Sequence, residues 1–463
     1  MSNLITALHI GASGIYTNQT GVQVTGNNIT NANTAGYSKQ TANVTSASSL
    51  TQGSLVYGTG STVDTIDRSS DIFITKQLVA QSAVYGKYEA SSAPLGDIEQ
   101  ILGISETSLS SDIDVFFDAW ETLSTNPAGT TERQSVIQEA EDLVTHFQQV
   151  DQQLGDVIKS INSSIESEIP DLNDQLQQIA DLNKNIMVTE VSNGNANTLR
   201  DQRDLLVQQV SETCGASIYS DDNGMICLQL DGGLPLVTGT VASTLSVDQV
   251  NGLSQISLNS GQSTFSLEGD DFGGTLGGLF TVRDEVIPQY QNDIDQLAYE
   301  IATDVNTLHS TGLDLNGDVA TDLFSLIVPT DPTANAWQDA AASITVNFDD
   351  TTLIAAGTSG QTGDNSLTLS IAELRDTATI NGSTYTEEYA RIAAGAGLLV
   401  SSNEDKLLSS TELLSNINDK RDSACGVSSE EEMLLLIQYQ SGYEAAASYI
   451  SVIKEMIDQL MSI

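Results

Sequence analysis

Histidines, which could bind a metal ion, are few and widely spaced in this 463-residue chain. None of its histidines takes part in the HExxH spacing of a zinc enzyme. The segment Asp314–Asp318 has the acidic spacing of a calcium loop, but Val319 stands where that loop needs glycine and Ser325 where it needs glutamate. We therefore interpret Asp314–Asp318 as a polar turn and expect no metal site. The histidines are His9, His146 and His309.

Three other segments could suggest catalysis or nucleotide binding. Gly11–Gly14 places a serine between glycines but lacks the Gly-x-Ser-x-Gly pattern of a nucleophile elbow. Gly273–Asp284 lacks the Gly-Lys-Ser/Thr end of a phosphate-binding loop, and we expect it to form a tight turn into a helix. Glu430–Glu432 would place negative charge at the first turn of a helix, where the helix dipole favours it. We therefore predict no catalytic residue and no cofactor.

The cysteines also indicate a structural role. Cys214, Cys227 and Cys425 are an odd number and show no CxxC spacing. Neither a disulfide framework nor a zinc site is indicated by this pattern, because both need paired cysteines. We therefore expect free, buried thiols.

The charge of the chain restricts its partners. It carries 62 acidic and 16 basic residues, which gives a formal net charge of -46. Nucleic acids and anionic membranes bind clustered lysine and arginine, so we exclude both as partners. Only 17% of the residues are charged, so the polar surface is mainly uncharged. Such a surface forms hydrogen bonds at protein interfaces without the cost of desolvating charges.

Signals for secretion or membrane insertion are absent from the sequence. The first basic residue is Lys39, so the N-terminal segment lacks the positive region of a Sec signal. Apolar stretches stay well short of the roughly 18 residues that a membrane-spanning helix requires. We therefore expect a soluble protein without membrane insertion, which would leave the cell only by a route that needs no cleaved signal.

Both ends of the chain show the spacing of helices that pair with one another. Apolar residues recur there at steps of three, four or seven, as in a coiled coil. The C-terminal helix carries a second apolar row, which should face neighbouring subunits. Because glycine and asparagine interrupt the seam, we expect these ends to be disordered in the free monomer. The seam is predicted to contain Leu4, Leu8, Ile15, Val22, Ile29, Tyr439, Ala446, Ile453, Met456, Leu460 and Ile463, and the second row Tyr443, Ile450 and Ile457.

Between the ends, helical spacing alternates with short β-prone runs bounded by turn residues. We predict a mainly α fold with β insertions: paired coiled-coil terminal helices, a long helical-bundle body and one or two small β-rich units. Pro170 should break or kink the longest helix, because proline removes a helical hydrogen bond. The predicted boundaries are 1–42 and 424–463 for the paired termini, 43–212, 283–312 and 385–423 for the body, 213–282 for a small β unit and 313–384 for an outer β-rich insertion.

The outer insertion is expected to be a surface excursion. Its runs Ala342–Phe348 and Ser366–Leu369 have β-prone character, and Pro329 and Pro332 are typical of surface turns. Its removal should therefore leave assembly intact. Further turns are predicted at Asn193–Asn195 and Asp222–Gly224.

Motifs at both ends resemble the terminal signatures of bacterial flagellar axial proteins. The Asn-rich run 27–40 contains Thr-x-Gly-Tyr, and Val427–Met433 opens the C-terminal helix, with Ser428 in place of the usual asparagine. The segment Asn197–Leu206 resembles a signature of the hook-associated proteins at the hook–filament junction. On its residues alone it also predicts a helix capped by Asn197 with an Arg200–Asp204 ion pair. The motif residues are Asn28, Asn31, Thr34, Gly36, Tyr37, Asp201, Gln202, Arg203 and Asp204.

This resemblance implies a structural subunit that self-associates in a helical or ring assembly at the distal end of the hook and forms the junction with the filament. It also implies contacts with the hook protein and a second hook-associated protein, an export chaperone at about Met433–Ile463, and type III export to an extracellular flagellar position. Two alternatives stay open: another axial protein of the hook or rod type, or a carbohydrate-active enzyme on an axial framework with its site within 213–384. Gene neighbours would distinguish the enzyme from an assembly subunit.

Overall fold

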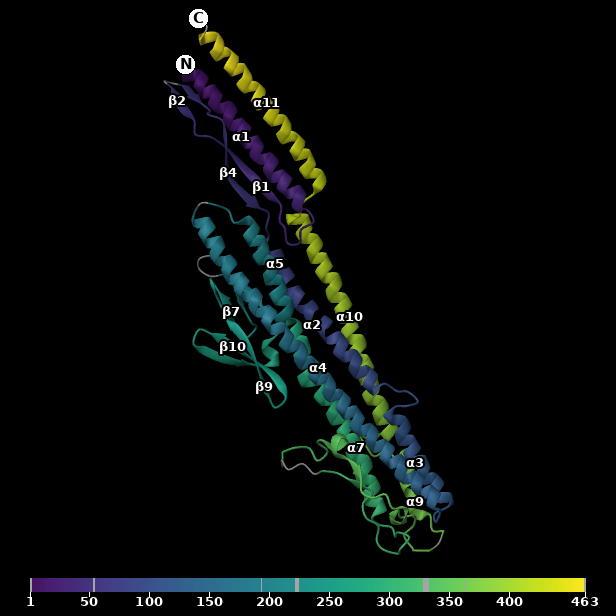
Figure 1. Ribbon diagram of the computed structural model, residues 1–463. Helices are drawn as coiled ribbons and strands as arrows, with labels where there is room; N and C mark the ends of the chain where they lie inside the picture. The colour runs from purple at the N-terminus through teal and green to yellow at the C-terminus, as the bar shows by residue number, and fades with distance from the viewer. Residues whose placement is uncertain are drawn as a thin grey trace.

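The computed structural model describes residues 2–52, 55–192, 194–220, 225–327, 333–361 and 363–461. The molecule is elongated, and both chain ends lie at one end of it (Figure 1). The N-terminal helix α1 (Ser2–Asn31, purple) and the C-terminal helix α11 (Ser429–Met461, yellow) run side by side there. The helical body extends away from this pair to the opposite end of the molecule, where α9 lies.

Long helices make up most of the body. They are α2 (Ile72–Leu102), α3 (Leu109–Thr125), α4 (Thr130–Val191), α5 (Asn197–Cys214), α7 (Ile287–His309) and α10 (Tyr385–Cys425). Shorter α-helices are α6 (Gly274–Thr281), α8 (Ala340–Ser343) and α9 (Ser366–Ala372). The strands are β1 (Gln40–Ser46), β2 (Leu50–Gln52), β3 (Leu55–Tyr57), β4 (Ser61–Arg68), β5 (Ser217–Ser220), β6 (Ile226–Gln229), β7 (Pro235–Thr238), β8 (Val241–Ala242), β9 (Thr244–Val250), β10 (Leu253–Ser260), β11 (Ser263–Leu267), β12 (Phe324–Ser325) and β13 (Thr345–Val346).

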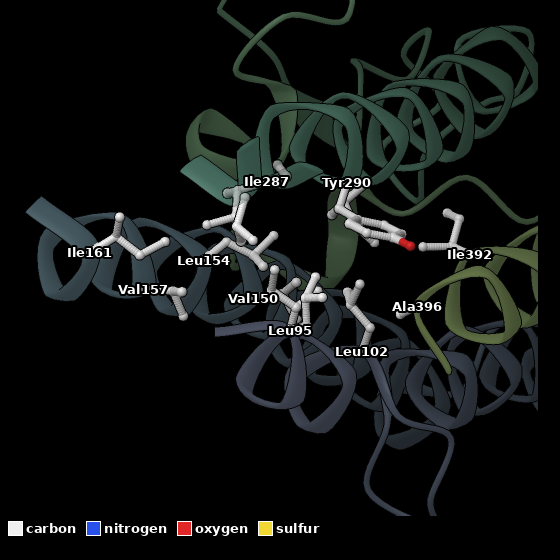
Figure 2. Packing of buried hydrophobic residues seen from close by; sticks show 14 of the residues in the cluster. Leu95, Leu102, Val150, Leu154, Val157, Ile161, Ile287, Tyr290, Ile392 and Ala396 are labelled. Carbon is white, nitrogen blue, oxygen red and sulfur yellow. The ribbon is translucent and has the colours of Figure 1, made fainter. Parts of the chain in front are cut away.

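The main hydrophobic core lies between helices that are distant in sequence. Figure 2 shows Leu95 of α2, Leu154 of α4, Ile287 and Tyr290 of α7 and Ala396 of α10 packed together. Each belongs to an apolar stripe with helical spacing, which turns one face of its helix toward the others. Helices α2 and α10 also run along one another, so helices from the two ends of the chain pack together in the body.

Helix α4 extends through much of the body. Its 62 residues correspond to about 93 Å of helix. A buried stripe from Val136 to Ile186 follows one face for almost the whole length, and this burial stabilises the helix. Pro170 lies inside α4, so the predicted break is wrong. The apolar stripe continues on both sides of Pro170, with Ile169 and Leu172 buried, and outweighs the loss of one hydrogen bond.

The small β unit forms two antiparallel sheets, of order β5-β6-β7-β8 and β11-β10-β9. Three asparagines of α4 form hydrogen bonds with the backbone of the β unit. Asn162 Nδ2 donates to Gly252 O at 3.1 Å, Asn173 Nδ2 to Leu245 O at 2.8 Å, and Asn183 Nδ2 to two further carbonyls. These side chains satisfy backbone groups at the sheet margin and fix the β unit against α4.

A β ribbon follows α1 before the body begins. Strands β1 and β4 pair antiparallel from Gln40 opposite Arg68 to Ser46 opposite Ser61, and β2 pairs with β3. The Thr17 hydroxyl of α1 lies 2.9 Å from the Ser61 hydroxyl, so this ribbon lies along α1. Residues 43–68 therefore differ from the helical body predicted for them. Their alternation of polar and small residues is a weak strand signal, because much of this ribbon faces solvent.

The segment 313–384 has less β structure than predicted. In the part of it that the structure describes, β12 pairs with β13 over two residues each, and the other pairings are isolated bridges such as Leu313 opposite Gly357. The strand predicted at Ser366–Leu369 is wrong, because these residues begin helix α9. Leu367 and Ile371 have helical spacing and are buried against the body, and Asp364 accepts the N–H of Ser366 at 3.1 Å. The alternation of polar and apolar residues in Ser366–Leu369 is also typical of a strand. The burial of Leu367 and Ile371, which are four residues apart, matches a helix instead.

The mainly α fold with β insertions, terminal helix pair and helical body is confirmed. Several predicted features lie outside the described residues or partly so: Asn193, the turn at Asp222–Gly224, Pro329, Pro332 and Ile463. Within the described part of the chain, none of the helices combines the length and apolar character needed to cross a bilayer.

Candidate functional site

The candidate site is the terminal pair, which we define as α1 and α11, together with its joint to the body. The two helices are antiparallel, and small residues of α1 form the contact. A Cβ atom on Gly21 would lie 2.6 Å from ring carbons of Tyr439, and one on Gly11 would lie 2.5 Å from Ile450. Any larger residue at Gly21 would displace the tyrosine ring, so the absence of a side chain sets the spacing of the pair.

The predicted interface residues divide between this seam and the solvent. Seam contacts are made by Tyr439, Ala446, Ile450 and Ile453, with Ile453 only 6% exposed. Partly buried residues are Leu4, Ile15, Val22, Ile29 and Ile457. Exposed residues are Leu8, Tyr443, Met456 and Leu460. Ile450 therefore lies in the seam rather than in the second row, whereas Met456 and Leu460 lie outside the seam that was predicted to hold them.

The sequence analysis missed part of the outward apolar surface. Ile5 and Tyr16 of α1 and Met433, Leu434 and Ile437 of α11 are exposed, with Leu434 at 70% and Tyr16 at 68%. Their spacing departs from the coiled-coil rows that were used to select interface residues. A helix whose apolar residues point in several directions is the sequence signal that could have indicated them.

The joint, the set of polar contacts between the terminal pair and the body, centres on Asn28 of α1. Asn28 Nδ2 donates to Gln40 O at 2.8 Å and to Glu432 Oε2 of α11 at 3.0 Å. Its Oδ1 accepts the Tyr37 hydroxyl at 2.8 Å and the Gln40 N–H at 3.0 Å. Four hydrogen bonds satisfy this buried amide, and together they link the end of α1, β1 and the start of α11.

A buried carboxylate fixes the start of α11. Glu432 is 1% exposed, and its Oε1 lies 3.1 Å from Lys39 Nζ. Lys39 also donates its N–H to Cys425 O, the last residue of α10, at 2.8 Å. Burial, with the charges of Asp201 and Glu432, raises the pKa of Tyr37 to about 12, which keeps the hydroxyl protonated as a donor. The α10–α11 connection is thus held by the segment that follows α1.

The Asp201–Asp204 motif forms the other half of the joint. Arg68 of β4 binds Asp201 Oδ1 and Asp204 Oδ2, both at 2.7 Å. Asp201 Oδ2 also accepts the Ser38 N–H at 3.2 Å. Arg203 is buried and binds Asn183 Oδ1 of α4 at 3.2 Å. The motif therefore connects α5, β4, α4 and the loop after α1, a role that the helix pattern alone did not indicate.

Local predictions for this motif need correction. The cap of α5 is Ala196, and Asn197 instead donates to Ile66 O of β4 at 2.7 Å. Arg200 binds Glu190 at 2.7 Å, so the predicted Arg200–Asp204 pair is wrong. Asp204 binds Arg68 rather than Arg200, because the planar guanidinium of Arg68 contacts the carboxylates of Asp201 and Asp204 at the same time. This arrangement requires the β1–β4 ribbon, which was not predicted.

The remaining motif residues have smaller roles. Gly36 adopts φ 77°, and a Cβ there would lie 3.2 Å from Leu205 Cβ, so this turn favours glycine. Asn31 donates to Asn27 O at 3.0 Å, and Thr34 donates to Asn31 Oδ1 at 3.3 Å, which closes the turn after α1. Gln202 faces solvent.

Histidines occupy structural positions. His309 is buried, its Nδ1 lies 2.7 Å from Thr321 O, and its Nε2 accepts the Ala355 N–H at 2.9 Å. Burial lowers the pKa of His309, which keeps the ring neutral at physiological pH. His146 Nδ1 lies 2.6 Å from Asp112 Oδ2 on the body surface. His9 is exposed on α1.

The acidic turn at Asp314 and the cysteines also have structural roles. Asp314 Oδ1 accepts the N–H groups of Asn316 at 2.8 Å and Asp318 at 2.9 Å, as in an Asx turn. The three cysteines are free and buried. Over the described residues, no three His, Cys, Asp or Glu side chains lie close enough to hold a metal ion.

Comparison with known proteins agrees with this arrangement. Residues 95–324 match the model of the flagellar hook-associated protein FlgK helical domain, and residues 423–463 match the flagellar basal body rod FlgEFG protein C-terminal model. Flagellar hook-associated protein 1 of Bacillus subtilis is 25% identical over the whole chain and 99% of its own length. Those of Salmonella typhimurium and Escherichia coli are 32% and 31% identical over 77% and 71% of this chain. Over most of its length the chain is similar to proteins of the flagellar hook-associated protein 1 family.

The hook-associated protein 1 relatives differ in length. This chain spans 61% of the E. coli relative and 65% of the S. typhimurium one. A solved structure of the flagellar hook junction protein FlgK from Burkholderia pseudomallei has the same fold, with a TM-score of 0.68 at 17% identity. That match covers 75% of this chain and all of the solved chain. Both matched family models include elements of the joint: Asp201–Asp204 lie in the helical-domain match and Glu432 in the C-terminal match.

Proposed function

We propose that this chain is a structural subunit of the bacterial flagellum that polymerises at the distal end of the hook and forms the junction with the filament. The observation that carries this proposal is the outward apolar surface of the terminal pair. Leu434, Tyr443, Met456 and Leu460 of α11 and Tyr16 of α1 are exposed in the single chain. Large apolar side chains that stay exposed along a helix pair of this length are typical of an interface with another molecule.

Coupled folding and assembly is the mechanism that this surface supports. In the seam of the terminal pair, Gly11 and Gly21 of α1 face Ile450 and Tyr439 of α11, so α1 contributes little apolar area at these contacts. Neighbouring subunits that cover the outward apolar residues would supply the missing burial. The terminal helices then order as each subunit is added, which also suits export of a flexible chain.

The partners and location follow from the same proposal. The subunit self-associates in a ring or helical layer, contacts the hook protein on one side, and receives a second hook-associated protein on the other. Its outward α11 surface suits an export chaperone before assembly, because Met433, Leu434 and Ile437 need cover in the free chain. The chain would then be secreted without a cleaved signal to an extracellular flagellar position.

The domain division predicted from sequence becomes part of this proposal. The terminal pair forms the polymerising core, the helical body extends away from it, and the β unit and the 313–384 segment lie on the body. A rod or hook subunit remains the nearest alternative, which the helical-domain match at 95–324 disfavours. We also propose that the chain has no enzymatic activity, in contrast to the carbohydrate-active alternative.

Complementation tests the proposal. A flagellated strain that lacks its own hook–filament junction protein receives this chain, and filament growth and the location of the chain are scored by immunogold electron microscopy. The expected result is filament growth with label between hook and filament. Export of the chain without label at hook tips would overturn the proposal. Label along the rod or hook would support the alternative axial role.

A further inference from the structure

One part of α2 has an unusual charge for this acidic chain. From residue 72 to residue 88 it contains Lys76 and Lys87 and no carboxylate, although acidic residues outnumber basic ones 62 to 16 overall. These lysines lie eleven residues apart, so they project from the same face of the helix about 16 Å apart. Neither lysine forms an ion pair within the described residues.

The same stretch lines an apolar groove. The groove has a volume of about 430 Å³ and lies between α2 and the start of the β unit. Val79, Ala83 and Val84 of α2 face Ala216 and Ile218 across it. Lys76 and Lys87 also line it, with one acidic residue, Asp231. The groove would therefore accept a segment that carries apolar side chains beside carboxylates.

The first turns of α11 have this complementary pattern. Glu430, Leu434 and Ile437 follow helical spacing on one exposed face, and Glu431 and Met433 flank it. The opposite face holds Glu432 in the joint. Leu434 is 70% exposed and is absent from the groove lining of its own chain, so its contact requires another copy.

Electrostatics favours this pairing between copies. Each chain carries a net charge of -46, so neighbouring copies repel one another unless cations meet carboxylates at the contacts. Most of the arginines already bind carboxylates within the chain, as Arg68 and Arg283 do. Lys76 and Lys87 are cations without an ion pair in the described part of the chain, and both line the apolar groove.

We propose that the α2 groove receives the first turns of α11 from a second copy of the chain, with Lys76 and Lys87 flanking Glu430. The contact is head-to-tail, so it propagates from one subunit to the next rather than closing a symmetric dimer. It rests on the proposed function, since it needs a homopolymer, and it names the surfaces that join its subunits.

Cysteine cross-linking tests the contact directly. The variant Ala83→Cys/Leu434→Cys is assembled on hooks and oxidised, and the native thiols do not interfere because they are buried. The expected result is a ladder of disulfide-linked multimers from assembled hooks and none from dilute monomer. The control, Val191→Cys/Leu434→Cys, carries a more exposed cysteine on α4 and should give no ladder. Normal assembly without a ladder, or an equal ladder from the control, overturns the proposal.

Charge exchange provides a second test that does not need the cysteine variant to assemble. Lys76→Glu/Lys87→Glu should reduce incorporation at hook tips by about tenfold or more, and adding Glu430→Lys should restore part of it. Lys159→Glu/Lys184→Glu on α4 makes the same change in net charge and should assemble normally. Loss without rescue, or equal loss in the control, overturns the contact. Failure of the unmodified chain to support filaments would instead contradict the proposed function.

Discussion

The body and the terminal pair are both built from long helices, but they bury different residues. In the body, Phe116, Phe117 and Trp120 are fully buried among leucines and isoleucines. In the terminal pair, Gly11 and Gly21 form the seam and large apolar residues face outward. Because stability follows the apolar area removed from water, we expect the body to be more stable than the terminal pair, which the proposed assembly would stabilise. The joint connects these two regions through hydrogen bonds and ion pairs.

The largest effect on stability should come from the body core. Trp120→Ala removes a fully buried indole that packs against Phe116, and should lower the free energy of unfolding by about 3–5 kcal/mol. Urea unfolding followed by circular dichroism measures this loss. Trp120→Phe keeps most of the packing and should cost far less, particularly as the indole N–H lacks a partner. Equal losses in both variants would contradict the packing argument.

The joint should give the next effect. Arg68→Met leaves the buried carboxylate of Asp201 without its cation, whereas Asp204 keeps Arg203, and should cost about 3 kcal/mol because a buried carboxylate then lacks a charged partner. The control, Lys159→Met, removes an exposed pair with Asp156 and should cost less than about 1 kcal/mol. Thermal unfolding of the two variants measures the difference. Similar midpoints would show that the joint is solvated and contributes little.

The pH dependence of the body should depend on His309. Burial lowers its pKa, so the neutral ring contributes stability that is fully present above its ordinary pKa near 6.5. This contribution is lost as the pH falls below that value, at a rate of about 1.4 kcal/mol per pH unit at most. Unfolding of the unmodified chain and of His309→Gln is compared between pH 7 and pH 5. We expect the difference between them to shrink on acidification, and a constant difference would contradict this role.

The smallest effect on body stability should come from the terminal pair. Ile453→Asp places a carboxylate in the seam, where it would abolish incorporation at hook tips, because a buried unpaired charge costs several kcal/mol in the assembled state. Unfolding of the body should stay unchanged, because the seam lies outside it. Ile453→Val keeps an apolar side chain and should assemble. Normal assembly of Ile453→Asp would remove residue 453 from the ordered seam.

Repeating chemical patterns made much of the fold predictable from sequence. The stripe along α4 and the rows on α11 are periodic, and each identified its helix. The joint was harder to predict, because Asn28, Arg68, Asp201 and Glu432 come from four distant segments and meet only in three dimensions. The β1–β4 ribbon was missed because its exposed strands lack an apolar face. Seam membership of Ile450 was missed because glycines, rather than the apolar row, determine which face of α1 packs.

Hydrogen exchange of the amides in α1 and α11, compared between verified monomer and assembled hooks, tests the central claim most directly. Exchange in the monomer should be fast throughout the terminal pair and slow in α4 and α7, because only the body buries enough apolar area to stay closed. In assembled hooks the terminal pair should become as protected as the body. Equal protection of α1, α11 and α4 in the monomer would contradict coupled folding and assembly.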